Sequence, residues 1–270
     1  MSDISNTIQE AQLMKQNRAD LITVLNQVGF PQVNAQTPLS EVAKYMQWAG
    51  GLLDVRLATF SKSTLQHRYW SYDEWMGTSA QVRSMYIQMG VVLRAEGQEF
   101  IIAKQNATSD SGTSSIAWGP GTNNIRGLTY FSSNPAIYDD MDGEANTNII
   151  LNHAESAGVD YPAARRARAY KCCSVSDGGL DDPTVWSLPA FGQEFLINKY
   201  YNEIAAALSQ FGMTAIPLVA HWTSTLRSSS SAWFYYVSQQ TYSSTSITTQ
   251  YAVRPVAKVQ PTESAAPQSL

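Results

Sequence analysis

The stretch from Ile204 to Val253 most constrains how this chain can fold. Its fifty residues include a single charged side chain, that of Arg227. Residues 232–237 form an aromatic run, and residues 246–254 alternate polar and apolar side chains. A period of two is typical of β-strands, since successive side chains point to opposite faces of a sheet. The stretch therefore predicts strands whose solvent-facing side is built from neutral polar groups.

Charged residues are scarce in the whole chain as well. The 270 residues include 18 Lys or Arg and 22 Asp or Glu, a share of 15%, where about 25% is usual. The 30 Ser and 20 Thr outnumber them. With 44% hydrophobic residues and a net charge of −4, the chain is expected to fold. A mildly acidic chain is a poor candidate for binding nucleic acid, so we expect no such partner.

Neither an export signal nor a membrane span is visible. Residues 1–6 show no basic start followed by an apolar block, which a signal peptide requires. No apolar run approaches the roughly 18 residues of a membrane-spanning helix. We expect no signal-directed export and no membrane insertion.

The predicted fold class is α+β, because short strands dominate from about residue 85 and two helical stretches, about 146–170 and 195–211, interrupt them. We expect a helical oligomerisation or anchoring module at 1–51, a connecting segment at 52–84, the main domain at 85–259 and a flexible tail at 260–270.

The N-terminal module carries apolar residues at helical spacings of three, four and seven. Its candidate anchoring or oligomerisation face consists of Ile4, Ile8, Leu21, Leu25, Val28, Leu39, Val42 and Met46. Two short helices cannot bury such stripes well against each other alone. The face either packs onto the rest of the same chain, or assembles with copies of the chain or with another protein.

Motifs for catalysis are missing from the sequence, which contains no GxSxG, Walker or HExxH pattern. His67, His153 and His221 are scattered, and we expect them at the surface or hydrogen-bonded in the core. Cys172 and Cys173 are adjacent, so they are poorly placed for a disulfide and are expected to be inert. We expect no enzyme and no cofactor.

Two charged clusters remain as candidates for ion binding. The acidic group consists of Asp139, Asp140, Asp142 and Glu144, and its spacing does not fit an EF-hand loop. It either binds a metal or accepts hydrogen bonds within a tight turn, and we prefer the turn. The basic group consists of Arg165, Arg166 and Arg168. It pairs with acidic residues, binds an anion or forms a solvated helix face, and we prefer the solvated face.

Several ordered motifs carry a resemblance to a known family. They are Trp186-Ser187-Leu188-Pro189-Ala190, Gln193-Glu194-Phe195, His221-Trp222-Thr223-Ser224-Thr225, Ala232-Trp233 and Val253-Arg254-Pro255-Val256, with Asp140 to Thr147 and Tyr161-Pro162-Ala163-Ala164 upstream. Over about residues 90–258 the chain resembles a bacterial and phage family of C-type-lectin-fold domains. The resemblance implies a C-type-lectin-like domain, and these motif positions are expected to be scaffold. We expect Trp222 and Trp233 to fill one small core, and Arg254 to form a buried or semi-buried ion pair.

The chain also departs from relatives of this fold. The EPN, QPD and WND tripeptides of calcium-dependent lectins do not occur, so sugar binding through calcium is not implied. The C-terminal part lacks the cysteines of formylglycine-generating enzymes, and Leu226 stands where the family has a glutamate. The resemblance thus implies a scaffold without a catalytic role.

A short helical N-terminal module followed by a domain with this resemblance suggests a phage virion protein of head-fibre or capsid-decoration type. Such a protein is assembled in the host cytoplasm and exposed on the particle. We expect a homo-oligomer, with a trimer favoured, that contacts the major capsid protein or other virion proteins. Its head is expected to contact a host surface glycan or receptor through Arg227, Ser229, Ser230 and Tyr242. The alternatives are a tail-fibre or receptor-binding adhesin and, less favoured, an enzyme of the formylglycine-generating fold.

Overall fold

The computed structural model describes residues 53–121, 124–132, 136–173 and 180–260, together with residues 19, 22, 34 and 36. All eight residues of the predicted anchoring face lie outside the described residues, as does the tail from residue 261. The chain divides into two compact units. One comprises residues 1–54 and 94–99, and the other comprises residues 55–93 and 100–270.

In the first unit, the described residues include a small charged cluster. The Arg94 guanidinium bonds Asp54 Oδ2 at 3.2 Å and Glu99 Oε2 at 3.0 Å. Glu96 and Gly97 make the turn beside it, and both have positive φ angles, of 52° and 76°. Two-residue hairpin turns favour such angles because they match the twist of the flanking strands.

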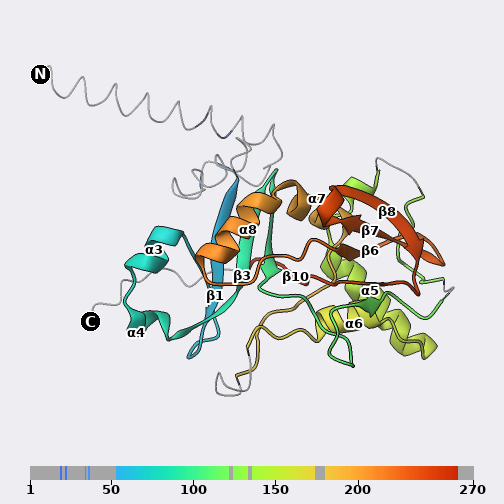
Figure 1. The fold of residues 1–270 in the computed structure, drawn as a ribbon, viewed down its shortest axis with the longest axis horizontal. Helices are drawn as coiled ribbons and strands as arrows, with labels where there is room; N and C mark the ends of the chain where they lie inside the picture. The colour runs from blue at the N-terminus through green and yellow to red at the C-terminus, as the bar shows by residue number, and fades with distance from the viewer. Residues whose placement is uncertain are drawn as a thin grey trace, which may run out of the picture. The chain divides into compact units, whose positions relative to one another are not determined.

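A five-stranded sheet has the order β10-β4-β3-β1-β2 (Figure 1). Its strands are β1 (Asp54–Ser61), β2 (His67–Trp70), β3 (Tyr86–Ala95), β4 (Gln98–Ala103) and β10 (Val256–Ala257). The C-terminal strand β10 pairs antiparallel with β4, with Val256 opposite Ile102. Residues 52–84 are therefore more than a connection, because they contribute β1 and β2 to the same sheet as the C-terminal strand.

Six helices lie in the described ranges, and local signals explain most of their ends. They are α3 (Tyr72–Gly77), α4 (Ala80–Arg83), α5 (Gly143–Ala157), α6 (Pro162–Arg168), α7 (Phe191–Lys199) and α8 (Tyr201–Gln210). The side chain of Asp142 caps the start of α5, and Gly158 ends it in the left-handed conformation. Pro162 opens α6 in the first turn, where its missing N–H costs nothing. None of these helices is both long and apolar enough to span a bilayer.

The helix predicted at 195–211 differs from the observed one. It begins four residues earlier, at Phe191, and is divided into α7 and α8. Tyr200, between the two, has φ −107° and ψ 27°, outside the helical region. The spacing of apolar residues hides this break, since both halves bury a face.

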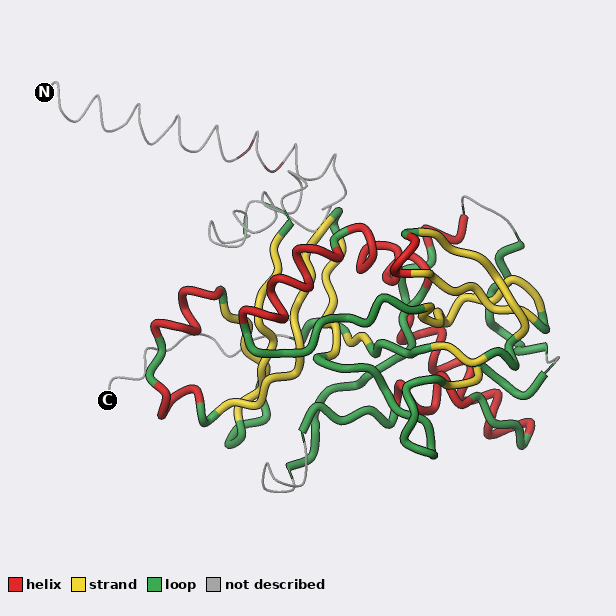
Figure 2. The backbone as a smooth tube through the Cα atoms, viewed as in Figure 1, coloured by secondary structure: helices red, strands yellow, loops and turns green. Residues whose placement is uncertain are grey.

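A three-stranded antiparallel sheet consists of β6 (Ala220–Ser228), β7 (Ser231–Tyr236) and β8 (Thr241–Ser246). A short pair, β5 (Ile116–Ala117) and β9 (Gln250–Tyr251), lies outside it. Much of the remaining backbone is loop (Figure 2). The α+β fold class predicted from the sequence is thus observed.

Tryptophans anchor the main core by donating their indole N–H groups. Trp118 Nε1 donates to Thr223 O at 2.7 Å, and Trp222 Nε1 donates to Ile116 O at 2.9 Å. These two bonds tie β6 to the β5 region. Trp186 Nε1 donates to Asp182 Oδ2 at 2.8 Å. All three rings are almost completely buried, so their polar atoms need these acceptors.

The expectation that Trp222 and Trp233 share one core is wrong. Trp222 lies in the main core, and Trp233 lies in a second cluster. Trp222 pairs with Phe234 across β6 and β7, so Trp233, one residue earlier, points to the opposite face of the sheet. The sheet of β6, β7 and β8 therefore carries a hydrophobic cluster on each face.

Candidate functional site

A buried polar group connects α7 to β6. The Nδ1 atom of His221 lies 3.0 Å from Oε1 of Glu194, and both side chains are completely buried. Asn198 Nδ2, one turn later in α7, donates to the same oxygen at 3.2 Å and to Glu194 O at 2.7 Å. Among the described residues, Glu194 Oε2 and His221 Nε2 have no hydrogen-bond partner. This pair ties a helix to a strand deep in the domain.

Arg254 is also buried, but its partners differ from those expected. Its guanidinium donates to Asn106 Oδ1 at 3.1 Å and to Thr214 O at 3.5 Å. In the part of the chain that the structure describes, these hydrogen bonds go to neutral oxygens, so the predicted ion pair is not formed by direct contact. Burial lowers the pKa of Arg254 to about 10, although the charges of Tyr170 and Glu194 oppose this shift. Arg254 remains a cation at neutral pH.

The acidic residues at the start of α5 form a turn and a helix cap. Asp142 accepts a hydrogen bond from Ala145 N at 3.0 Å and pairs with Lys258 at 3.2 Å. Asp140 accepts hydrogen bonds from Asn146 Nδ2 and, at 2.6 Å, from Thr225 Oγ1. Burial raises the pKa of Asp140, and these two hydrogen bonds counteract the shift. Within the described ranges, no cluster of three His, Cys, Asp or Glu is placed to hold a metal.

The basic residues of α6 are paired with carboxylates and amides. Arg165 bonds Asp160 at 2.9 Å and Asp110 at 2.8 Å, and Arg166 also bonds Asp110. Arg168 donates to Asn148 Oδ1 at 2.7 Å. The group therefore forms a paired, half-buried helix face, whereas the sequence favoured a solvated one.

The cysteines and two of the histidines occupy structural positions. Cys172 is buried, and burial raises the pKa of its thiol, which keeps it protonated. Cys173 Sγ lies 3.2 Å from Leu180 O. His67 is buried, with its ring nitrogens near Tyr69 and Thr184, and His153 is half-buried against Tyr161.

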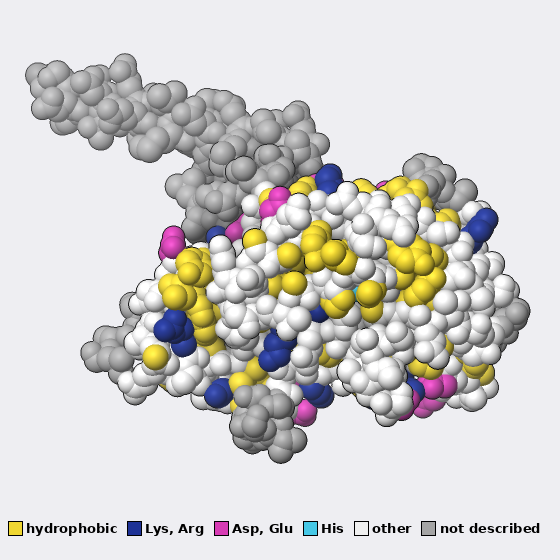
Figure 3. Space-filling view, viewed as in Figure 1, with side chains coloured by type: hydrophobic (Ala, Val, Ile, Leu, Met, Phe, Trp, Pro, Cys, Tyr) yellow, Lys and Arg dark blue, Asp and Glu magenta, His cyan; other side chains and the backbone are white. Residues whose placement is uncertain are grey.

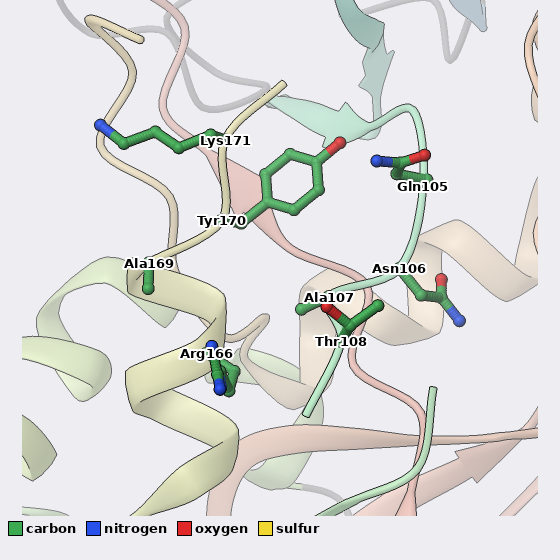
Figure 4. A pocket seen from close by; sticks show the side chains of 8 residues that line it. All are labelled: Gln105, Asn106, Ala107, Thr108, Arg166, Ala169, Tyr170 and Lys171. Carbon is green, nitrogen blue, oxygen red and sulfur yellow. The ribbon is translucent and has the colours of Figure 1, made fainter. Parts of the chain in front are cut away.

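A pocket of about 160 Å³ lies between the segment after β4 and the end of α6 (Figure 4). Its lining consists of Gln105, Asn106, Ala107, Thr108, Arg166, Ala169, Tyr170 and Lys171. Both of its cations are already paired, Arg166 with Asp110 and Lys171 with Asp181 at 3.0 Å. The Lys171 side chain extends away from Tyr170 (Figure 4). The pocket is small and polar, and it offers no unpaired cation for selecting an anion.

The second hydrophobic cluster forms a partly exposed surface, which we call the aromatic face. It consists of the partly buried residues Phe131, Tyr138, Phe195 and Tyr242 around the buried ring of Trp233, with Arg227 at its rim. Buried Ile137, Phe191 and Tyr235 support it from below. One gathering of hydrophobic side chains lies over β7 and β8, on a surface that is mostly neutral polar (Figure 3). Aromatic rings therefore converge here from η1 (Ala136–Asp139), α7, β7 and β8.

The structure brings two of the predicted contact residues together on this face. Arg227 lies over the ring of Trp233, 5.8 Å from its centroid, and donates to Ser244 Oγ at 3.0 Å. The ring of Tyr242 lies 6.1 Å from that of Trp233. Trp233 Nε1 donates to Phe131 O at 2.9 Å, which fixes the indole. Arg227 and Tyr242 thus flank one immobilised ring.

The other two predicted contact residues, Ser229 and Ser230, form the β6–β7 turn. Ser230 is exposed and Ser229 is half-buried. Their neighbour Ser228 accepts a hydrogen bond from Ser230 N at 3.3 Å, and its hydroxyl lies 2.7 Å from that of Ser231. These hydroxyl groups stabilise the turn, which lies at the end of the strands that carry the aromatic face.

Tyr138 and Phe195 belong to the aromatic face but were missed by sequence reasoning. The ring of Tyr138 lies 4.8 Å from that of Phe195 and 5.9 Å from that of Tyr242. Burial and a hydrogen bond with Tyr242 raise the pKa of Tyr138 to about 12, so the Tyr138 phenol stays neutral at physiological pH. The signal that could have found Tyr138 is its place in an aromatic segment just before the acidic turn.

Comparisons with known proteins add little. No protein-family model matches the chain, and no curated protein matches it significantly. Among solved structures, the chain is similar to a fimbrial protein from Bacteroides ovatus ATCC 8483, with a TM-score of 0.43 and 12% sequence identity. The similarity covers 59% of this chain and 35% of the fimbrial protein's length. A similarity this weak carries no argument about fold family or function.

Proposed function

We propose that the chain is a structural component of a phage virion, of head-fibre or capsid-decoration type, with a C-terminal C-type-lectin-like domain exposed on the particle. The N-terminal module anchors it to the major capsid protein or another virion protein and joins it to further copies, with a trimer favoured. The head presents the aromatic face to a host surface glycan or receptor. The sequence resemblance supports the virion assignment.

One observation carries the recognition role: exposed Arg227 and half-buried Tyr242 flank the buried, immobilised ring of Trp233. Trp, Tyr and Arg dominate the binding energy of protein interfaces, because they combine a large contact area with few rotatable bonds or many donors. The surrounding surface is neutral, so a ligand is held by short-range contacts and is not steered to the surface by a long-range electrostatic field.

The buried polar groups support a structural role for the domain. Glu194, His221 and Arg254 carry chemistry that an enzyme could use, but they are completely or almost completely buried and connect helices to strands. The motif residues of the resemblance thus build a rigid scaffold, and the exposed aromatic face lies on that scaffold.

Two experiments test the proposal. Immunogold labelling of purified virions is expected to place the protein on the outside of the head; labelling of the tail supports the adhesin alternative, and absence from virions contradicts the assignment. Alanine substitutions at Arg227 and Tyr242 are expected to slow adsorption to host cells at least about tenfold, as for interface hot spots. Ser238→Ala, at an exposed position in η3 (Val237–Gln239), is the matched control. Unchanged adsorption of both variants contradicts the receptor role.

A further inference from the structure

Tyr138 connects the aromatic rings of α7 with a ring of β8. Its ring lies 5.4 Å from that of Phe191, 4.8 Å from that of Phe195 and 5.9 Å from that of Tyr242. Tyr138 belongs to η1, a short 3-10 helix over Ala136–Asp139. Helices of this kind are short because their hydrogen-bond geometry is poor. The position of Tyr138 therefore depends on how η1 is attached to the rest of the domain.

Asp140, the residue directly after η1, attaches it to three other elements. The Asp140 carboxylate accepts hydrogen bonds from Asn146 Nδ2 in α5 at 3.0 Å and from Thr225 Oγ1 in β6 at 2.6 Å. The main-chain oxygen of Asp140 accepts a hydrogen bond from Gly192 N, in the first turn of α7, at 2.8 Å. One residue thus fixes the end of η1 against two helices and a strand.

Gly192 allows η1 to approach α7 this closely. A Cβ atom at this position would collide with the main-chain oxygens of Tyr138 and Asp140. Main-chain atoms cannot rotate away as a side chain can, so the segment that carries Tyr138 lies directly on the first turn of α7. A displacement of Asp140 therefore displaces Tyr138 as well.

The hydrogen bonds of the Asp140 carboxylate require its ionised form. An ionised carboxylate only accepts hydrogen bonds, whereas a protonated one must also donate through one oxygen. Thr225 Oγ1 already directs its proton to Asp140 and accepts a hydrogen bond from Phe191 N at 2.8 Å. Asn146 Nδ2 can only donate. Protonation of Asp140 therefore places donors opposite each other and replaces charge-assisted hydrogen bonds with weaker neutral ones.

The surroundings of Asp140 favour its protonation within the folded protein. Burial raises the pKa of Asp140 and the Asp142 carboxylate raises it further, although the hydrogen bonds from Thr225 and Asn146 lower it. Asp142 is itself paired with Lys258 at 3.2 Å. Because an Asp of the unfolded chain titrates near about pH 3.9, the folded chain takes up this proton first as the pH falls. Its uptake therefore does not favour unfolding, and the change stays local.

Charged side chains on the elements packed against Asp140 have partners of their own. In α5, Glu144 Oε2 lies 3.9 Å from Lys258 Nζ. In α7, Glu194 contacts His221 at 3.0 Å. In β6, Arg227 donates to a serine hydroxyl of β8 at 3.0 Å. Asp140 differs from these residues because its carboxylate accepts hydrogen bonds from neutral side chains.

We propose that the ionised carboxylate of Asp140 positions Tyr138 within the aromatic face, and that protonation of Asp140 on acidification releases η1 and rearranges the face. We call this change the Asp140 switch. It rests on the proposed recognition role of the aromatic face, because it describes how that face is regulated. Contact with a host glycan or receptor is strongest at neutral pH and weakens as Asp140 takes up its proton.

An NMR titration of the isotope-labelled full-length chain, from about pH 7.5 to about pH 4, tests the Asp140 switch without any ligand. The Gly192 amide reports the hydrogen bond to Asp140 O, and the Trp233 indole N–H reports the aromatic face. We expect both signals to move in one common step, with a midpoint above the value of about 3.9 of an unperturbed Asp. Absence of this step overturns the proposal.

Two neighbouring carboxylates provide a matched pair of variants. Asp140→Asn removes the titrating group with little change in volume, so both signals are expected to be independent of pH and to resemble the acid form of the wild type. Asp139 is exposed, and Asp139→Asn is expected to keep the step of the wild type. A step that persists in Asp140→Asn, or that disappears in Asp139→Asn, overturns the proposal.

Thr225→Val gives a second measurement that does not depend on the folding of Asp140→Asn. The hydrogen bond from Thr225 lowers the pKa of Asp140, so its removal is expected to move the midpoint of the step to higher pH. Thr225→Ser keeps the hydroxyl and is expected to restore the midpoint of the wild type. An unchanged midpoint in Thr225→Val overturns the assignment of the step to Asp140.

Adsorption to host cells separates this proposal from the proposed function. The wild type is expected to adsorb at least about tenfold more slowly at acidic than at neutral pH, and Asp140→Asn slowly at both, as for the loss of an interface hot spot. If the NMR step occurs but the protein has no part in adsorption, the Asp140 switch is supported and the receptor role fails. If the step is absent, the Asp140 switch fails whatever the adsorption shows.

Discussion

Glu194 and His221 form a contact of 3.0 Å between two side chains that are both fully removed from solvent. Glu194 belongs to α7 and His221 to β6, and the charge of Glu194 raises the pKa of Arg254 against the effect of burial. Taking charged groups out of water is costly, so a buried pair contributes to stability only while both partners are present. The contact thus helps to fix the orientation of α7 on the sheet.

Replacing Glu194 with Gln is expected to lower the free energy of unfolding by about 3–5 kcal/mol, because it breaks the buried contact with His221 and removes a charge that favours the Arg254 cation. Urea unfolding followed by circular dichroism measures the change. Glu203→Gln, at an exposed residue in the first turn of α8, is the control and is expected to stay within about 0.5 kcal/mol of the wild type. Similar losses for both variants would show that the buried pair has no special role.

The stability of the protein is expected to fall on acidification through His67. Burial lowers the pKa of His67 from 6.5, although the charge of Asp182 opposes the shift. The unfolded chain therefore takes up the proton first as the pH falls below about 6.5, which favours unfolding. The contribution is complete above this pH and is lost progressively toward the lower folded-state pKa. Unfolding free energies at several values between pH 7.5 and 5 are expected to decline less steeply in His67→Gln, and equal slopes would contradict the prediction.

Thr225 joins three elements through one hydroxyl group. It donates to Asp140 at 2.6 Å and accepts a hydrogen bond from Phe191 N, at the start of α7, at 2.8 Å. Thr225→Val keeps the shape and removes both bonds, so we expect a loss of about 1–3 kcal/mol in the free energy of unfolding. Thr225→Ser keeps the hydroxyl and is expected to retain most of the stability. Thermal and urea unfolding measure the stability of the two variants. If Thr225→Ser is as unstable as Thr225→Val, the loss comes from packing and not from the hydrogen bonds.

Gly90 in β3 is required by its neighbours. A Cβ atom at this position would collide with the carbonyl oxygen of Ile102 in β4, and the φ angle of 156° is rare for other residues. Gly90→Ala is expected to cost about 3 kcal/mol or more, because two paired strands must move apart. Gly77→Ala is the matched control, since nothing lies within 4 Å of its Cβ position, and it is expected to be neutral or stabilising by up to about 1 kcal/mol. Expression and melting temperature of the two variants give the comparison.

Local sequence signals predicted the helical stretch at about 146–170 in outline. The structure has two helices there, and α5 begins earlier than expected because the side chain of Asp142 caps it. The turn preferred for the acidic cluster is observed, since Asp142 accepts a hydrogen bond from Ala145 N. The basic cluster is paired with carboxylates and not merely solvated. The N-terminal face and the oligomeric state stay predictions.

The sequence by itself determined the α+β class, the strand-rich final third and the neutral character of its surface, because these follow from residue types and periods that act within a few positions. Only the tertiary structure decided that Trp222 and Trp233 face opposite ways and that the helix after Phe191 breaks at Tyr200. It also decided that Arg227 and Tyr242 flank one ring. The physical reason is strand register: a shift of one residue sends every side chain to the other face, and register is set by contacts between segments far apart in the chain.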